Sequence, residues 1–124
     1  MKKIVVLLLL AGLAGFWALA ADVPAGKEVL KLQAKMGTVT FKHKEHAARA
    51  GNCKVCHHKL EEGATPRACS ECHDRKVVKD EAPKLKNALH KTCGDCHASR
   101  QEAGEKAGPL TAMKAKQCKK CHVR

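Results

Sequence analysis

Eight cysteines and eight histidines stand out in this chain of 124 residues. The cysteines form four C-x-x-C pairs, and a histidine directly follows each pair. The four motifs are Cys53-Lys-Val-Cys56-His57, Cys69-Ser-Glu-Cys72-His73, Cys93-Gly-Asp-Cys96-His97 and Cys118-Lys-Lys-Cys121-His122. Two thiols about one helical turn apart can each bond to a vinyl group of one porphyrin, and the next imidazole can bind its iron. The motifs therefore predict four covalently attached haem c groups.

Three other uses of paired cysteines fit these motifs less well. Two C-x-x-C pairs can hold zinc through four thiolates, but a zinc site needs no histidine after each second cysteine. A disulfide framework suits a small exported chain, yet it explains none of the histidines. A thioredoxin-like dithiol needs one pair on a βαβ scaffold rather than four pairs.

Four further histidines remain, which equals the number of predicted irons. They are His43, His46, His58 and His90. Methionine is the common alternative sixth ligand in electron-transfer haems. Beyond residue 20 only Met36 and Met113 are present, so methionine could serve two sites at most. We therefore expect two histidines on each iron, which leaves no open coordination position.

Short spacings between these histidines predict closely packed haems. His43 and His46 lie three residues apart in a helical pattern that Gly51 ends, so they share one helix face. If both bind iron, we expect them to bind two different haems. His57 and His58 are adjacent, so one can serve the first haem while the other reaches a neighbouring iron.

The composition excludes an ordinary hydrophobic core. Aromatic residues make up 2% of the chain, and Phe41 is the only one beyond residue 20. The net charge is +12. A highly charged chain with few large apolar residues is unfolded unless something else fills its interior. We expect a small fold, mostly α-helical and irregular, with little regular secondary structure and a core packed by haem.

The remaining segments predict a few short elements. Val29–Leu32 and Thr38–Phe41 alternate like strands and predict a short two-stranded element near the N-terminus. Loops are expected between the haem motifs, over Gly63–Pro66, Lys79–Pro83 and Gly104–Pro109. Short helices are expected over Pro83–Lys91 and Leu110–Gln117.

The N-terminal segment has the features of an export signal. Lys2 and Lys3 precede an apolar run that ends at Ala18-Leu-Ala20, an A-x-A cleavage pattern. The run is short and glycine-containing for a membrane span. We therefore expect residues 1–20 to be cleaved and residues 21–124 to form a single periplasmic domain without stable membrane insertion.

These motifs resemble the tetrahaem cytochrome c3 family of class III c-type cytochromes. The resemblance covers nearly all of residues 21–124, although many members have four residues inside the second and fourth cysteine pairs. It implies axial pairs for the four haems, in order: His57 with His43, His73 with His58, His97 with His46, and His122 with His90.

The resemblance also implies an electron carrier rather than an enzyme. Its expected partners are periplasmic hydrogenase, formate dehydrogenase or a membrane cytochrome complex in anaerobic respiration. Lysines near the fourth motif could form a docking surface for an acidic partner: Lys114, Lys116, Lys119 and Lys120. A multihaem reductase of metal ions or oxyanions is the alternative. We expect a monomer, and the lack of a stacking platform argues against nucleic-acid binding.

Overall fold

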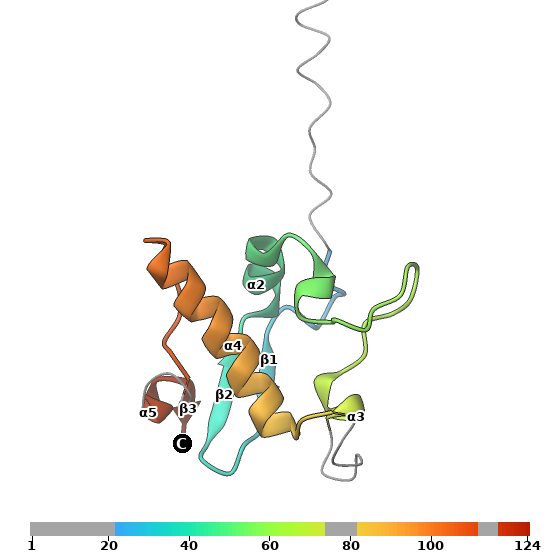
Figure 1. Cartoon of the computed structure of the whole chain (residues 1–124). Helices are drawn as coiled ribbons and strands as arrows, with labels where there is room; N and C mark the ends of the chain where they lie inside the picture. Colours follow the sequence, from blue (N-terminus) through green and yellow to red (C-terminus); the bar gives the residue numbers. More distant parts are fainter. Residues whose placement is uncertain (1–21, 74–81, 112–116) are drawn as a thin grey trace, which may run out of the picture.

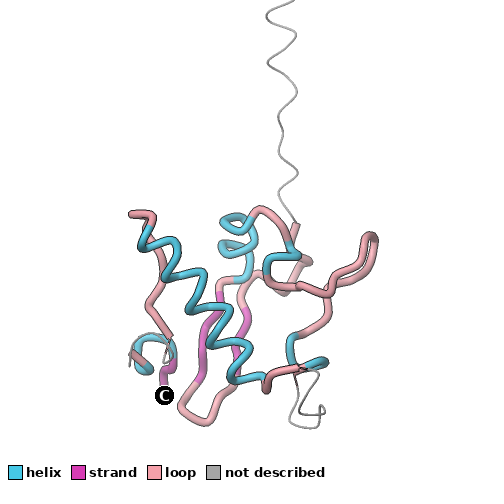
Figure 2. Tube along the Cα trace, in the orientation of Figure 1, coloured by secondary structure: helices cyan, strands magenta, loops and turns pink. Residues whose placement is uncertain are grey.

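The computed structural model describes residues 22–73, 82–111 and 117–124. The expected export signal therefore lies outside the described residues, as do Lys114, Lys116 and most of the helix expected over residues 110–117. Among the described residues the fold has a long helix, a shorter helix, several single helical turns and a narrow sheet (Figure 1). Irregular backbone joins most of these elements (Figure 2). This agrees with the mostly helical and irregular fold that the sequence predicts.

The sheet contains both expected strands and one unexpected strand. β1 (Leu30–Leu32) pairs antiparallel with β2 (Thr38–Phe41), close to the predicted ranges. On the other side of β2 lies β3 (His122–Val123), also antiparallel, with Val39 opposite His122. A two-residue strand is too short to show an alternating pattern, so the sequence did not reveal it. The pairing attaches the C-terminal histidine motif to the N-terminal hairpin.

Gly37 allows this close approach between the hairpin and the C-terminus. Its φ is +125°, a conformation that residues with a side chain rarely adopt. A Cβ atom at Gly37 would lie 2.6 Å from the carbonyl oxygen of Val123. The turn before β2 therefore needs glycine for two separate reasons.

The helix that carries His43 and His46 is confirmed. α2 spans His43–Ala50, and Gly51 follows it in the left-handed conformation with φ +70°. The N–H of Gly51 donates to the carbonyl of Ala47 at 3.0 Å, which ends the helix as the sequence predicts.

Helical turns also carry the four cysteine pairs. The first pair begins on a 3₁₀ turn, η1 (Cys53–Val55), with Cys56 directly after it. The second pair lies on α3 (Cys69–Cys72) and the fourth on α5 (Cys118–Cys121). The third pair lies inside α4 (Leu85–Glu102), an 18-residue helix. The expected short helix over residues 83–91 was therefore too short. A cysteine pair is itself a helical turn and Lys91–Asp95 is an i,i+4 ion pair, so the helix continues through the motif.

Protein side chains do not form a hydrophobic core in the described part of the chain. No hydrophobic side chain is buried there, and only Gly94 and Thr111 are buried residues. No helix among the described residues is long and apolar enough to cross a membrane.

Candidate haem-binding sites

Each cysteine motif is arranged as a turn that brings its histidine back beside its first cysteine. The N–H of His57 donates to the carbonyl of Cys53 at 2.8 Å, and the N–H of His73 donates to Cys69 at 2.9 Å. The N–H of His122 bonds in the same way to Cys118. This geometry suits attachment of both thiols to one flat group with the imidazole beside it.

All eight histidines face each other in four pairs. Each pair joins a motif histidine to one of the four other histidines. The distances between ring centroids are 6.2 Å for His43–His57, 5.8 Å for His58–His73, 6.3 Å for His46–His97 and 6.2 Å for His90–His122. These are the same pairs that the family resemblance implies. The adjacent residues His57 and His58 turn toward different partners, as their spacing suggests.

The separations fit two imidazoles that share one metal ion. A histidine nitrogen lies about 2 Å from a bound metal ion, so two imidazoles on opposite sides of one ion have ring centroids about 6 Å apart. Aromatic contact alone allows a wider range, from about 4.5 to 7 Å. All four pairs fall between 5.8 and 6.3 Å. The eight histidines therefore fit four haem irons, with two histidines for each.

Hydrogen bonds to backbone carbonyls fix the tautomer of six of these histidines. The Nδ1 atoms donate to the carbonyls of Lys27 (from His43, 3.0 Å), Lys42 (His46, 2.8 Å), Arg67 (His57, 3.1 Å), Pro83 (His73, 2.8 Å), Pro109 (His97, 2.8 Å) and Gly37 (His122, 3.3 Å). A carbonyl only accepts, so Nδ1 must carry the hydrogen and Nε2 keeps a free lone pair. Metal-binding histidines are oriented in this way.

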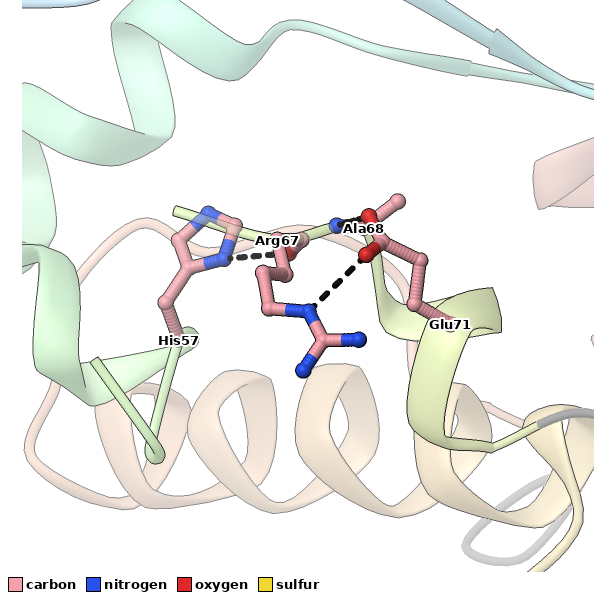
Figure 3. A network of polar contacts seen from close by, with 4 residues as sticks. All are labelled: His57, Arg67, Ala68 and Glu71. Atoms are coloured by element: carbon pink, nitrogen blue, oxygen red, sulfur yellow. Dashed lines mark hydrogen bonds and ion pairs between the residues drawn. The ribbon is translucent and has the colours of Figure 1, made fainter. Parts of the chain in front are cut away.

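A small polar network connects the first motif with the second (Figure 3). The carbonyl of Arg67 accepts the Nδ1 hydrogen of His57, while the Arg67 side chain donates to Glu71 at 2.9 Å. Glu71 also accepts the N–H of Ala68 at 2.8 Å, which caps the first turn of α3. These bonds lower the pKa of Glu71, chiefly through Arg67 and then Ala68. Glu71, which lies in the second motif, thus holds Arg67, whose carbonyl accepts the hydrogen bond from His57.

The segment after α4 lies against the ring of His97. A Cβ atom at Gly108 would lie 2.5 Å from Cε1 of that ring. Gln101 donates to the carbonyl of Gly108 at 2.8 Å, and the next carbonyl, that of Pro109, accepts from His97. Thr111 then donates to the carbonyl of His90 at 2.7 Å. One returning segment therefore contacts two ligand candidates on α4.

Phe41 packs between the two candidate ligands of α2. Its ring centroid lies 4.4 Å from that of His46 and 5.8 Å from that of His43. Phe41 is the only aromatic residue beyond the expected export signal. Phe41 therefore lies just before α2 and contacts both histidines that this helix presents as candidate ligands of two haems.

The described side chains do not form a site for a bare metal ion. Burial raises the pKa of Cys93 to about 11, with smaller contributions from other cysteines. Within residues 22–73, 82–111 and 117–124, no three His, Cys, Asp or Glu side chains gather to hold a bare metal ion. Burial, then His122 and Lys86, lower the pKa of His90, which favours the neutral imidazole that binds iron.

The motifs and the four further histidines predicted all sixteen of these residues, but the carbonyl partners of the histidines were not predicted. Loops that end at Pro66, Pro83 and Pro109 were expected. The acceptors for His57, His73 and His97 are Arg67, directly after Pro66, and the other two prolines themselves. A proline about ten residues after each of the first three motif histidines was the available signal.

Comparison with known proteins shows the family of this chain. Residues 18–122 match the model of the class III cytochrome c family, and the chain belongs to that family. It is 34% identical over 104 residues to cytochrome c7 of Geobacter metallireducens (78% of this chain, 98% of that protein). It is also 34% identical over 107 residues to cytochrome c3 of Maridesulfovibrio salexigens (80% and 86%).

Two further similarities concern larger proteins or the fold alone. The high-molecular-weight cytochrome c of Nitratidesulfovibrio vulgaris is 30% identical over 116 residues (86% of this chain); this match spans 20% of that protein. The fold is similar to that of the di-tetrahaem cytochrome c3 of Desulfovibrio gigas, with a TM-score of 0.60 and 23% identity over 83% of this chain and 99% of that chain. The protein is thus a multihaem c-type cytochrome of an electron-carrying family, and its eight cysteines form attachment sites for four haem c groups.

Proposed function

We propose that residues 21–124 form a low-potential periplasmic electron carrier in which two histidines bind each of four haem irons. The proposal rests on one observation above all, the four histidine pairs with ring separations between 5.8 and 6.3 Å. Each haem, when bound, would accept and release one electron. The paired histidines would be His57 with His43, His73 with His58, His97 with His46, and His122 with His90.

The protein side chains would keep these iron sites closed and their ligands oriented. With a histidine on both sides, no coordination position is open to a substrate, which favours a carrier over a catalyst. The carbonyl bonds of Arg67, Pro83 and Pro109 would prevent their histidines from rotating away. Ligation by histidine without methionine favours a low potential, because a methionine ligand raises it.

The location in the periplasm is supported by the N-terminus. The family match begins at residue 18, after most of the apolar run. We propose cleavage after Ala20.

The partners would be redox proteins such as hydrogenase, formate dehydrogenase or a membrane cytochrome complex. The net charge of +12 and the exposed side chains of Lys119 and Lys120 on α5 support docking of an acidic protein beside the fourth motif. Lys119→Gln with Lys120→Gln should slow reduction by such a partner several-fold at low salt, and less at high salt. Lys54→Gln is a matched control, because Lys54 is the exposed lysine inside the first motif.

A potentiometric titration of the purified protein, followed by its optical spectrum, tests this function. We expect four one-electron reductions, all at potentials well below those of cytochromes with a His/Met iron. A high-potential haem, or a ferric spectrum with high-spin iron, would contradict the proposal and favour the alternative reductase of metal ions or oxyanions.

A further inference from the structure

Two arginines follow the ligand candidates of the third haem at the same spacing. Arg49 comes three residues after His46 on α2, and Arg100 comes three residues after His97 on α4. Residues three apart lie on neighbouring positions of one helix face. The two arginines therefore extend from the helices that present the two facing rings.

These arginines cross-link the two helices and the segment that follows α4. Arg100 donates through Nη2 to the carbonyl of Arg49 at 2.9 Å and through Nη1 to Glu105 at 2.5 Å. Arg49 donates through Nη1 to the carbonyl of Lys106 at 3.0 Å. We call these two arginines, with Glu105 and the Lys106 carbonyl, the arginine clamp.

The clamp differs from the other ion pairs among the described residues. The pairs Lys42–Glu45, Arg67–Glu71 and Lys91–Asp95 each lie within three or four residues of sequence. The bonds of the clamp to the carbonyls of Arg49 and Lys106 span 51 and 57 residues. The clamp therefore constrains tertiary structure, whereas the other pairs support local turns.

Little else in the described protein holds α2 at its distance from α4. The two helices are not among the elements that pack extensively together, and no hydrophobic side chain is buried in the described residues. Yet the rings of His46 and His97 must stay at 6.3 Å for both to bind one iron. The clamp also anchors the segment whose Pro109 carbonyl orients His97.

We infer that Arg49 and Arg100 are positioning residues that keep His46 on the iron of the third haem. This inference rests on the proposed pairing of His46 with His97. Loss of the clamp would let α2 move away from α4, so that His46 leaves the iron more often. An external ligand could then take the vacated position.

Cyanide binding to the oxidised holoprotein tests this role. Bis-histidine iron binds cyanide only when one histidine leaves, so the rate reports how often the ligand is released. Arg100→Ala should bind cyanide about tenfold faster at one haem, the lower end of the usual effect of residues that orient metal ligands. Arg100→Lys keeps the charge but cannot reach Arg49 and Glu105 together, so it should show an intermediate increase. Arg49→Ala should also bind cyanide faster.

Two reference variants make the result specific. His46→Ala opens the third haem directly, so its cyanide complex identifies that haem by NMR. Lys44→Ala removes an exposed positive charge from α2 without touching the clamp, and it should bind cyanide at the wild-type rate.

The outcomes separate this inference from the proposed function. If His46→Ala binds cyanide readily while Arg100→Ala, Arg100→Lys and Arg49→Ala match the wild type, the clamp has no positioning role and the ligand pairing stands. If His46→Ala binds cyanide no better than the wild type, the pairing itself is wrong, and the inference is overturned with it.

Discussion

The ring of His58 lies 5.8 Å from that of His73, whereas its neighbour His57 faces His43 at 6.2 Å. Two adjacent histidines thus belong to two different candidate iron sites. This arrangement brings the first two haem motifs together over a very short stretch of backbone. It explains how 104 residues after the expected cleavage site could hold four large cofactors without a hydrophobic core of their own.

Replacement of His58 should open the second haem and leave the others closed. In oxidised His58→Ala, we expect one of the four irons to become high-spin, because His73 would remain as its only protein ligand. EPR with quantified spins measures this fraction. Lys59→Ala is the control, since Lys59 is the next exposed residue in the chain, and it should leave all four irons low-spin.

A side chain at Gly108 should disturb the ligand on α4. The Cβ atom of Gly108→Ala would lie 2.5 Å from Cε1 of His97, so either the ring or the returning segment must shift. Overpacking of this kind costs about 1–3 kcal/mol, which should appear as a lower Tm and an altered potential of one haem.

The control for that variant separates ring contact from backbone strain. Gly63 has φ +74° and no atom within 4 Å of an added Cβ. Gly63→Ala should therefore destabilise the protein by about 1 kcal/mol through its backbone alone and leave every haem potential unchanged. An equal shift of potential in both variants would contradict the account of His97.

The carboxylate of Glu71 should give a small stability that depends on pH. Its bonds to Arg67 and Ala68 lower its pKa below the ordinary value of 4.5. A group with a lowered pKa stabilises the folded state above its ordinary pKa, and this contribution is lost as the pH falls through the lowered value.

Glu71→Gln should therefore lower the Tm at pH 7, by no more than about 2 °C because the pair is exposed. The difference from the wild type should shrink as the pH falls below 4.5. Thermal unfolding followed by circular dichroism measures both values. Glu62→Gln removes the same charge from the exposed neighbouring loop and is the control, with a Tm at pH 7 equal to that of the wild type.

Removal of the haems should unfold the chain. No hydrophobic side chain is buried in the described residues, so the polypeptide alone has little to offset its conformational entropy. Circular dichroism of haem-free residues 21–124 should show neither stable helix nor a cooperative transition. A cooperative unfolding transition in that sample would contradict a haem-packed core.

The sequence predicted the residues of the haem-binding sites more completely than the backbone segments that connect them. Covalent haem attachment sets the spacing within C-x-x-C-H. The motif from Cys53 to His57 and the three other motifs could therefore be identified from the sequence alone. Glycine and strand patterns also predicted α2 and the first two strands. The pairing of β3 with β2 was not predictable, because it depends on where the fold brings His122 relative to Gly37.

The length of α4 and the carbonyl bonds were missed for a related reason. The helix was expected to end near Lys91 on the basis of local sequence propensity. The third cysteine motif is itself a helical turn, so the helix continues through it to Glu102. The carbonyls of Pro83 and Pro109 have no side-chain signature. These carbonyls accept hydrogen bonds from histidines only because the tertiary fold brings each loop back beside its motif histidine.

Spin-quantified EPR of the fully oxidised wild-type holoprotein, together with its haem content, tests the central claim most directly. With two histidines on every iron, the spectrum should contain four low-spin ferric irons per chain and no high-spin signal. A high-spin signal equivalent to one or more irons per chain, or fewer than four haems, would contradict the pairing of all eight histidines.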